Sequence, residues 1–204
     1  MTLVHQDPIN VIVCGVGGQG NVLVANLIGD ALNRKGYLVT VGDTYGAAQR
    51  GGAVYSTIRI SSRKTYGPLI PEGAAHVIVG LEPLETLRSL VRYGNPRAVC
   101  LTNVRTIYPV GVMANGLEYP DEDELREAIK SLSKSVWFID ASDMAKSLGV
   151  EIAMNVVMAG ALIGSGQVPL TKNDVREAIR RFFPASRIDV NLKAFDMGID
   201  ATKT

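Results

Sequence analysis

The stretch Ile9-Asn-Val-Ile-Val-Cys-Gly-Val-Gly-Gly-Gln-Gly20 decides the fold of this chain. An apolar, β-branched run leads into a G-x-G-x-x-G turn made by Gly15, Gly17 and Gly20, and an apolar helical pattern follows. Strand, glycine turn and helix in this order are typical of the first unit of a Rossmann-like α/β fold. Such a turn directs backbone N–H groups and a positive helix N-terminus at one point. The stretch therefore predicts a site for a phosphate or a carboxylate.

The composition is that of an ordinary globular domain. The 204 residues suit one α/β domain, with 47% apolar and 20% charged residues. The formal net charge of +1 argues against nucleic acid as a main partner, because phosphate binding needs a clustered basic surface. No apolar run is long enough to span a membrane, and the first residues lack a signal-peptide core. We expect a soluble, cytoplasmic protein.

The residues that most often carry catalysis or metals are few. The two cysteines, Cys14 and Cys100, fall in apolar strand patterns and show no C-x-x-C spacing, so four-cysteine ligation of an iron–sulfur cluster is excluded for this chain alone. The two histidines, His5 and His76, accompany no nucleophile. We find no Ser-His-Asp set, metal triad or P-loop lysine, and we assign no catalytic residue. A fold built to hold an anion without catalytic groups suggests a subunit.

Strand and helix patterns alternate along the chain. A hairpin between the strand at 54–60 and a short strand at 65–69 would make the mostly parallel sheet a mixed one. We expect one domain over residues 1–204, with a tail from about Asp200. The other strands are expected at 11–14, 38–41, 76–81, 98–102 and 136–140, and the helices at 21–35, 82–93, 121–132, 140–148, 152–163, 171–182 and 192–197. Thr171 and Asp174 occupy capping-box positions, and Ser142 is the expected cap of the helix at 140–148.

A second candidate site follows the second strand, in Tyr45-Gly-Ala-Ala-Gln-Arg-Gly-Gly52. The Arg50 guanidinium lies between Gln49 and Gly51-Gly52, so backbone N–H groups and a bidentate cation could reach one carboxylate or phosphate. This loop follows the carboxyl end of a strand, where ligands of α/β sheets bind. Later in the chain, Asn155 opens an apolar helix and could cap it or hydrogen-bond to the glycine turn, and Gly160 would let another helix or subunit approach closely.

The glycine turn also allows a different function, binding of NAD(P) by a self-contained oxidoreductase. That function needs an acidic residue at the end of the second strand, and Asp43 occupies roughly this position. Against it, Gln19 departs from the generic fingerprint and the chain shows no separate substrate domain.

Taken together, the motifs resemble the gamma-type domain of 2-oxoacid:ferredoxin oxidoreductases, most closely the beta subunit of the indolepyruvate branch. The resemblance runs from about Ile9 to Asp196 and rests on five motifs in a fixed order. They are Gly15-Val-Gly-Gly-Gln-Gly20, Ala48-Gln-Arg-Gly-Gly52, Pro68-Leu-Ile-Pro-Glu-Gly73, Gly80-Leu-Glu-Pro-Leu-Glu85 and Asn155-Val-Val-Met-Ala-Gly-Ala161.

The resemblance implies a three-layer, Rossmann-like αβα fold. It also implies one subunit of an enzyme that oxidatively decarboxylates a 2-oxoacid to an acyl-CoA and passes electrons to ferredoxin. Sister enzymes that use pyruvate, 2-oxoglutarate or branched-chain oxoacids are the alternative. The resemblance places thiamine diphosphate and the iron–sulfur clusters mainly on a larger partner subunit, with none bound by this chain alone. In isolation the chain could form homodimers through the apolar surface meant for that partner.

The expected contacts to an anionic substrate or to CoA follow from these motifs. They are Gly15, Gly17, Gly18, Gln19, Gly20, Gln49, Arg50, Gly51, Gly52 and Asn155.

Overall fold

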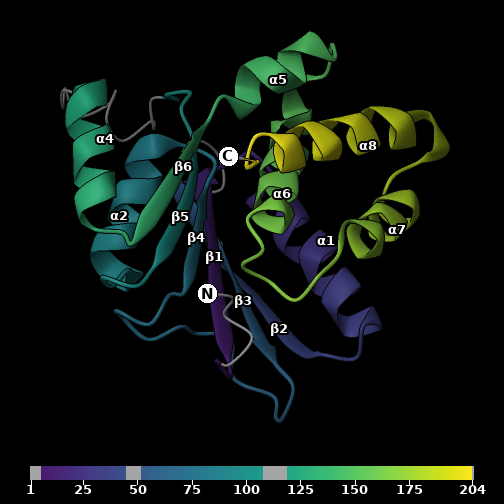
Figure 1. The fold of residues 1–204 in the computed structure, drawn as a ribbon, viewed down its shortest axis with the longest axis horizontal. Coiled ribbons are helices and arrows are strands. Elements are labelled where there is room, and N and C mark those ends of the chain that lie inside the picture. Colours follow the sequence, from purple (N-terminus) through teal and green to yellow (C-terminus); the bar gives the residue numbers. More distant parts are fainter. Residues whose placement is uncertain (1–5, 45–51, 108–118, 204) are drawn as a thin grey trace.

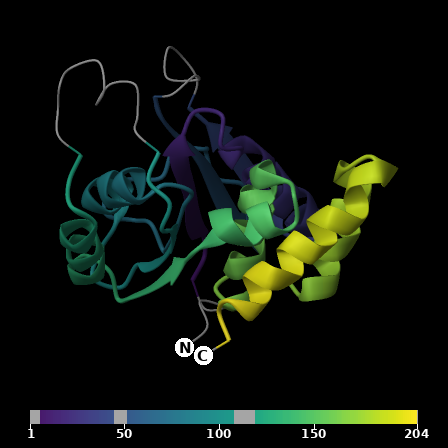
Figure 2. The same ribbon diagram turned by 90° about the horizontal axis from the view of Figure 1, so that it is seen from above.

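The computed structural model describes residues 6–44, 52–107 and 119–203. Its centre is a six-stranded sheet with the order β2-β3-β1-β4-β5-β6, covered by helices on both faces (Figures 1 and 2). The strands are β1 (Ile9–Val16), β2 (Leu38–Asp43), β3 (Ala53–Ser61), β4 (Val77–Gly80), β5 (Val99–Asn103) and β6 (Ser135–Ile139). The helices are α1 (Asn21–Arg34), α2 (Pro83–Tyr93), α4 (Glu122–Ser131), α5 (Ala141–Ser147), α6 (Met154–Gly164), α7 (Lys172–Phe182) and α8 (Ala185–Asp200), with a 3-10 turn η3 (Glu151–Ala153) before α6.

The sheet is mixed, as the sequence predicted, but for a different reason. Strand β3 pairs antiparallel with both β1 and β2, while β1, β4, β5 and β6 are parallel. The prediction of a strand at 65–69 is wrong. This segment is irregular and crosses over β2 and β3 instead of pairing with them. Side chains of the two strands donate to its carbonyls. Thr40 of β2 donates to Tyr66, and in β3 Arg59 donates to Gly67 and Leu69 and Thr57 to Pro68.

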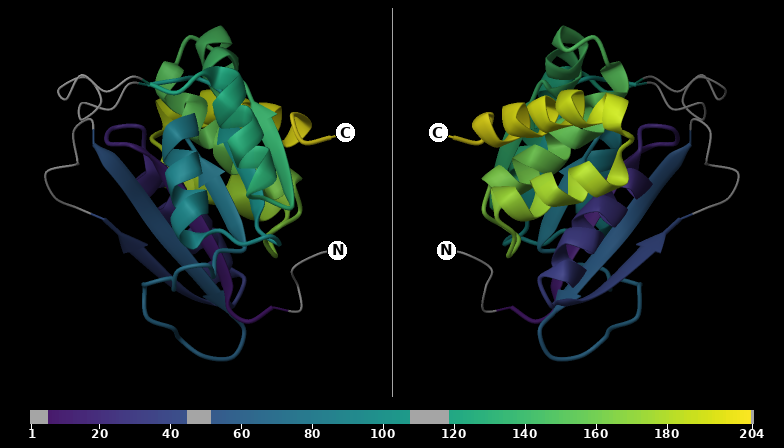
Figure 3. Two further views of the ribbon diagram at one scale, coloured as in Figure 1. Left: turned by 90° about the vertical axis from the view of Figure 1, so that its left-hand side faces the viewer. Right: turned by 90° about the vertical axis from the view of Figure 1, so that its right-hand side faces the viewer.

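The two faces of the sheet have separate cores because successive side chains of a strand point to opposite sides. Val11 and Val13 of β1 pack in the cluster under α1 and α6, whereas Ile12 and Cys14 pack in the one under α2. Helices α2 and α4 form one outer layer and α1 and α6 the other, which confirms the three-layer αβα architecture. Helices α7 and α8 lie outermost, over α1 and α6 (Figure 3).

Close contact between α6 and α8 depends on glycine. A Cβ built on Gly160 would lie 2.1 Å from the Phe195 carbonyl oxygen, and one on Gly198 would lie 1.9 Å from that of Val157. The close approach predicted at Gly160 is therefore confirmed, and the neighbour is a helix of the same chain. That helix is longer than the expected 192–197 because it begins directly after Pro184, whose fixed φ suits a helix start.

Side-chain caps are present at the starts of α2, α4, α5 and α7. The predicted capping box of α7 is present, with Thr171 accepting from the Asp174 amide and the Asp174 carboxylate accepting from the Thr171 amide. Ser142, which the sequence indicated as the cap of α5, is not the cap. Asp140 accepts from the Asp143 amide at 3.1 Å, and the Ser142 hydroxyl accepts a hydrogen bond from Asn103 instead.

Candidate functional site

The glycine turn lies at the carboxyl edge of the parallel strands, where β1 leads to α1 on one face and β4 leads to α2 on the other. Such a switch point is where open α/β sheets bind ligands. Gln19, 7% exposed, fixes the turn: its Oε1 accepts from the Val16 amide at 2.6 Å, and its Nε2 donates to the Leu81 carbonyl at 2.9 Å. The side chain of Gln19 therefore joins the ends of β1 and β4.

The turn is also stabilised by a second amide side chain, that of Asn155 in α6. Asn155 is 3% exposed and donates to the Gln19 carbonyl at 3.2 Å, while α6 has no side-chain cap. Of the two roles that the sequence left open for this residue, the structure therefore shows the contact with the turn and not the cap. The position of Asn155 also accounts for Gly20, which has a φ of 90° and whose Cβ would lie 2.2 Å from the Asn155 amide nitrogen. Gly20 is thus required by packing against α6.

Internal hydrogen bonds use part of the anion-binding capacity that the sequence suggested. The Gly17 amide donates to the Gly52 carbonyl at 2.9 Å, and the Gln19 amide donates to the Val16 carbonyl at 3.1 Å. Gly18 differs, since its φ is 104° and a Cβ there would meet nothing within 4 Å. Gly18 is therefore the glycine of the turn with open space beside it.

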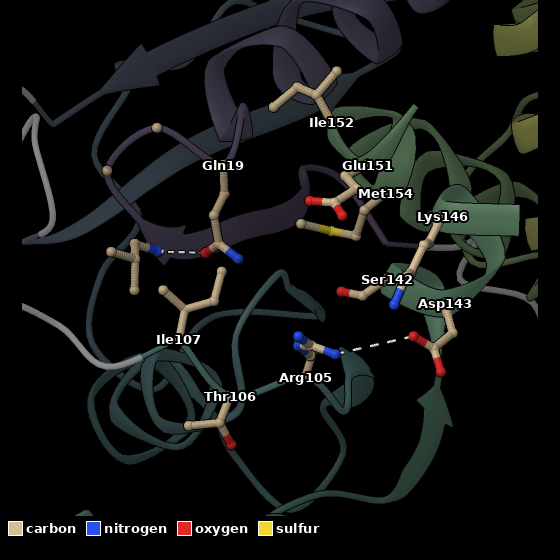
Figure 4. A pocket seen from close by; sticks show the side chains of 13 residues that line it. Gln19, Arg105, Thr106, Ile107, Ser142, Asp143, Lys146, Glu151, Ile152 and Met154 are labelled. Atoms are coloured by element: carbon tan, nitrogen blue, oxygen red, sulfur yellow. Dashed lines mark hydrogen bonds and ion pairs between the residues drawn. The ribbon is translucent and has the colours of Figure 1, made fainter. Parts of the chain in front are cut away.

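A cavity of about 790 Å³ opens beside this turn (Figure 4). It lies between the glycine turn, the segment after β5, the start of α5 and the η3 turn. Its size is within the range of small-molecule sites. Its lining residues are Val16, Gly17, Gly18, Gln19, Arg105, Thr106, Ile107, Ser142, Asp143, Lys146, Glu151, Ile152 and Met154.

Charge in the cavity comes from four side chains. Arg105 and Asp143 form a loose ion pair, with 4.0 Å between nitrogen and oxygen and more than half of each side chain exposed. Lys146 points into the same space (Figure 4) and, among the described residues, has no acidic group within 4.0 Å. Glu151 also lines the cavity, beside Met154 (Figure 4). The two cations and two carboxylates balance in number, so Lys146, which lies outside the ion pair, is the first candidate to hold an anionic ligand. Ile107 and Ile152 line the same cavity and suit an apolar part of that ligand.

The structure unites only part of the predicted site. Gly17, Gly18 and Gln19 line the cavity. The other described residues of the predicted site stabilise the turn through packing and hydrogen bonds and do not line the cavity; they are Gly15, Gly20, Gly52 and Asn155. The predicted residues Gln49, Arg50 and Gly51 lie outside the described residues.

Arg105 and Lys146 were missed by the sequence reasoning. Arg105 follows β5 closely, so its place at the carboxyl end of a parallel strand was the available signal. Lys146 offered no such signal, because it comes from the end of a surface helix.

Strand order argues against the NAD alternative. In a dinucleotide-binding fold the second strand lies beside the first, which brings its terminal acid to the ribose. Here β3 lies between β1 and β2, so Asp43 is two strand spacings, about 10 Å, from β1. Its carboxylate accepts a hydrogen bond from the buried Ser56, which in turn accepts one from Asn21.

The cysteines do not suit an iron–sulfur cluster. Cys14 and Cys100 are free and buried, and burial raises the pKa of Cys14 to about 12 and that of Cys100 well above its usual value. A cluster needs thiolates that converge on one point. No group of three or more His, Cys, Asp or Glu side chains within residues 6–44, 52–107 and 119–203 could hold a metal ion. None of the helices in these ranges is long and apolar enough to cross a membrane.

The comparison with protein families decides the relationship. A family model described as pyruvate ferredoxin/flavodoxin oxidoreductase matches residues 10–201. The chain belongs to this family. Its members are subunits or domains of 2-oxoacid:ferredoxin oxidoreductases, so this chain is a component of an oxidoreductase enzyme. The chain is also 38% identical over 195 residues to indolepyruvate oxidoreductase subunit IorB of Thermococcus kodakarensis, covering 95% of this chain and 96% of that one.

Solved structures share the fold. The gamma subunit of a keto/oxoacid ferredoxin oxidoreductase from Geobacter sulfurreducens PCA superposes with a TM-score of 0.67 at 21% identity, covering 95% of this chain and 98% of that one. A 2-oxoglutarate:ferredoxin oxidoreductase from Magnetococcus marinus, with 2-oxoglutarate, coenzyme A and succinyl-CoA bound, gives a TM-score of 0.75 at 22% identity. There the match covers 97% of this chain and 31% of the other, so the same unit forms part of a longer chain.

Proposed function

We propose that this chain is the smaller subunit of a ferredoxin-dependent, indolepyruvate-type oxidoreductase that converts a 2-oxoacid to an acyl-CoA. The observation that carries the proposal is the 38% identity to IorB over nearly the full length of both chains. Sister enzymes represented by the solved structures are only 21–22% identical, a level that supports the shared fold and not the substrate.

We further propose that all 204 residues form one gamma-type module that assembles with a larger subunit. That partner would carry thiamine diphosphate, which activates the oxoacid carbonyl, and the iron–sulfur clusters that pass electrons to ferredoxin. The two buried, protonated cysteines of this chain support a location of the clusters elsewhere. Free thiols are also usual in the cytoplasm, where we expect the complex.

For the cavity, we propose binding of an anionic group of CoA or of the oxoacid. Arg105 and Lys146 would hold the anion, Gly18 would let it approach the backbone, and Ile107 and Ile152 would contact its apolar part. We also propose that Gln49, Arg50 and Gly51 contact the same anion. The chain's own part in the reaction is therefore binding and orientation.

Anaerobic purification of the tagged chain from its host tests the assignment. We expect a larger partner with iron–sulfur absorbance and bound thiamine diphosphate, and a higher kcat/KM for indolepyruvate than for pyruvate or 2-oxoglutarate. A preference for either of the latter would reassign the substrate to a sister class. A colourless homodimer that retains NAD(P) would overturn the proposal.

In the assembled enzyme, Arg105→Met and Lys146→Met test the cavity. Each should raise the KM for CoA or for the oxoacid by about tenfold, the effect of one charge-assisted hydrogen bond. Arg97→Met is the control, since Arg97 is an exposed arginine at the opposite edge of the sheet. Unchanged KM values for both cavity variants would contradict the anion site.

A further inference from the structure

Glu82, which has no part in the proposed function, is a completely buried carboxylate between the sheet and α2. It follows β4 in the Gly80-Leu-Glu-Pro-Leu-Glu85 motif and caps α2. Its Oε2 accepts from the Glu85 amide at 2.9 Å. One carboxylate oxygen is enough for this capping bond, and serine or aspartate would also supply it.

The second oxygen of Glu82 has a different partner. The Tyr119 hydroxyl donates to Oε1, and the Tyr119 ring packs against the small cluster formed by Leu84 and Leu125. Burial raises the pKa of Glu82, while hydrogen bonds from Tyr119 and from the Glu85 and Ile107 amides lower it, leaving the pKa above its usual value. The carboxylate thus joins the start of α2 to Tyr119.

The same network extends to the cavity wall. Thr106 lines a small second cavity together with Pro83, which follows Glu82, and Leu125, against which Tyr119 packs. Burial and the bond to Glu82 raise the pKa of Tyr119, whereas the Thr106 side chain lowers it. Thr106 and Ile107 both line the cavity beside the glycine turn and directly follow Arg105. The wall segment 105–107 is otherwise tied to the sheet at its preceding residue, where the Val104 amide donates to the Ile139 carbonyl at 3.0 Å.

We propose that Glu82, acting through Tyr119, is a positioning residue that fixes the cavity wall at residues 105–107 and thereby aims Arg105 at the ligand. The part of the proposal that concerns the ligand rests on the proposed function; the part that concerns the wall does not. Glu82 and Tyr119 are absent from the cavity lining, so neither needs to touch the ligand.

Tyr119→Phe is the decisive variant, because it keeps the packed ring and the cap of α2 and removes only the hydroxyl. In the full chain, amide hydrogen exchange of residues 104–107 should become about fivefold faster, the equilibrium effect of one net hydrogen bond. Glu82→Gln should have a similar effect, since the NH₂ group of the glutamine would face either the Tyr119 hydroxyl or the Glu85 amide, both of which donate to Glu82. Asp121→Asn is the matched control: Asp121 caps the adjacent α4 through the Asp123 amide and is absent from the cavity lining.

The assembled enzyme provides the second readout. Tyr119→Phe should raise the KM for CoA or for the oxoacid about fivefold with kcat unchanged, and Asp121→Asn should change neither. Unchanged exchange at 104–107 in Tyr119→Phe overturns the proposal, as does an equal rise throughout the chain, which would show general destabilisation. Faster exchange at the wall in a complex without oxoacid activity would instead refute the proposed function and leave the positioning role intact. If Glu82→Gln does not fold, Tyr119→Phe still decides.

Discussion

The glycines of this chain include two kinds, those required by close packing and those with open space beside them. Where α6 crosses α8, Gly160 and Gly198 let backbone meet backbone, and an added Cβ would overlap a carbonyl oxygen of the other helix. In the turn after β1, Gly18 has open space beside it and faces the cavity. Gly20, in the same turn, resembles the first group because the Asn155 side chain occupies the space that a Cβ would need. A glycine motif is therefore evidence for a ligand only at the positions that a neighbouring side chain does not occupy.

The largest effect is expected at the helix crossing. Gly160→Ala and Gly198→Ala should each lower the free energy of unfolding by about 3 kcal/mol, because backbone must move to admit the methyl group. Urea unfolding measures this. Since one separation of the two helices would relieve both overlaps, the double variant should lose less than the sum.

Gly67→Ala is the control for these variants, because a Cβ there meets nothing within 4 Å. It should change the stability by less than about 0.5 kcal/mol. Equal losses in Gly67→Ala and Gly160→Ala would remove the distinction between the two groups.

A smaller effect is expected at Gly20. Gly20→Ala should cost about 2 kcal/mol, from the strain of a positive φ and from displacement of Asn155, whose amide nitrogen would lie 2.2 Å away. In an Asn155→Ala background the displacement is absent, so the same substitution should cost about 1 kcal/mol less. A double-mutant cycle measures the coupling, and strict additivity would show that Asn155 does not determine the residue at position 20.

Gly18→Ala should cost only about 1 kcal/mol of stability, because its φ of 104° is strained for alanine but no atom is displaced. The KM of the assembled enzyme for CoA or for the oxoacid should nevertheless rise, since the methyl group would enter the cavity. Thermal unfolding and steady-state kinetics on one preparation separate the two effects. A large stability loss with unchanged KM would place Gly18 with the packing glycines.

The smallest effect is expected away from both regions, at the capping box of α7. Burial raises the pKa of Asp174, but hydrogen bonds from Thr171 and Lys35 outweigh it and leave the pKa below the usual 3.8. A lowered folded-state pKa contributes stability above the unfolded value, and this contribution is lost as the pH falls through the folded value. Asp174→Asn should therefore cost about 0.5 kcal/mol at pH 7 and less below pH 3.8, as followed by urea unfolding. A loss of unfolding free energy that does not depend on pH would show that it comes from the hydrogen-bond geometry of the amide and not from the charge of Asp174.

Local patterns determined much of the architecture. Apolar runs, the glycine turn and capping residues predicted the positions of the strands and of most helices, because each signal acts within a few residues of the backbone it controls. Five ordered motifs also pointed to the family that the comparison confirmed. These are properties that one segment of the chain carries by itself.

Only the tertiary structure decided the strand order and the charges of the cavity. Side chains of β2 and β3 bind the carbonyls of the segment after β3, so that segment does not pair as a strand, and β3 takes the place beside β1 that a dinucleotide fold gives to β2. Gly18 and Arg105 are far apart in the chain and meet because β1 and β5 end at one edge of the sheet, and α5, which follows β6, brings Lys146 to the same cavity. Such contacts between distant residues depend on long-range packing and on competition between hydrogen-bond partners, which no single segment encodes.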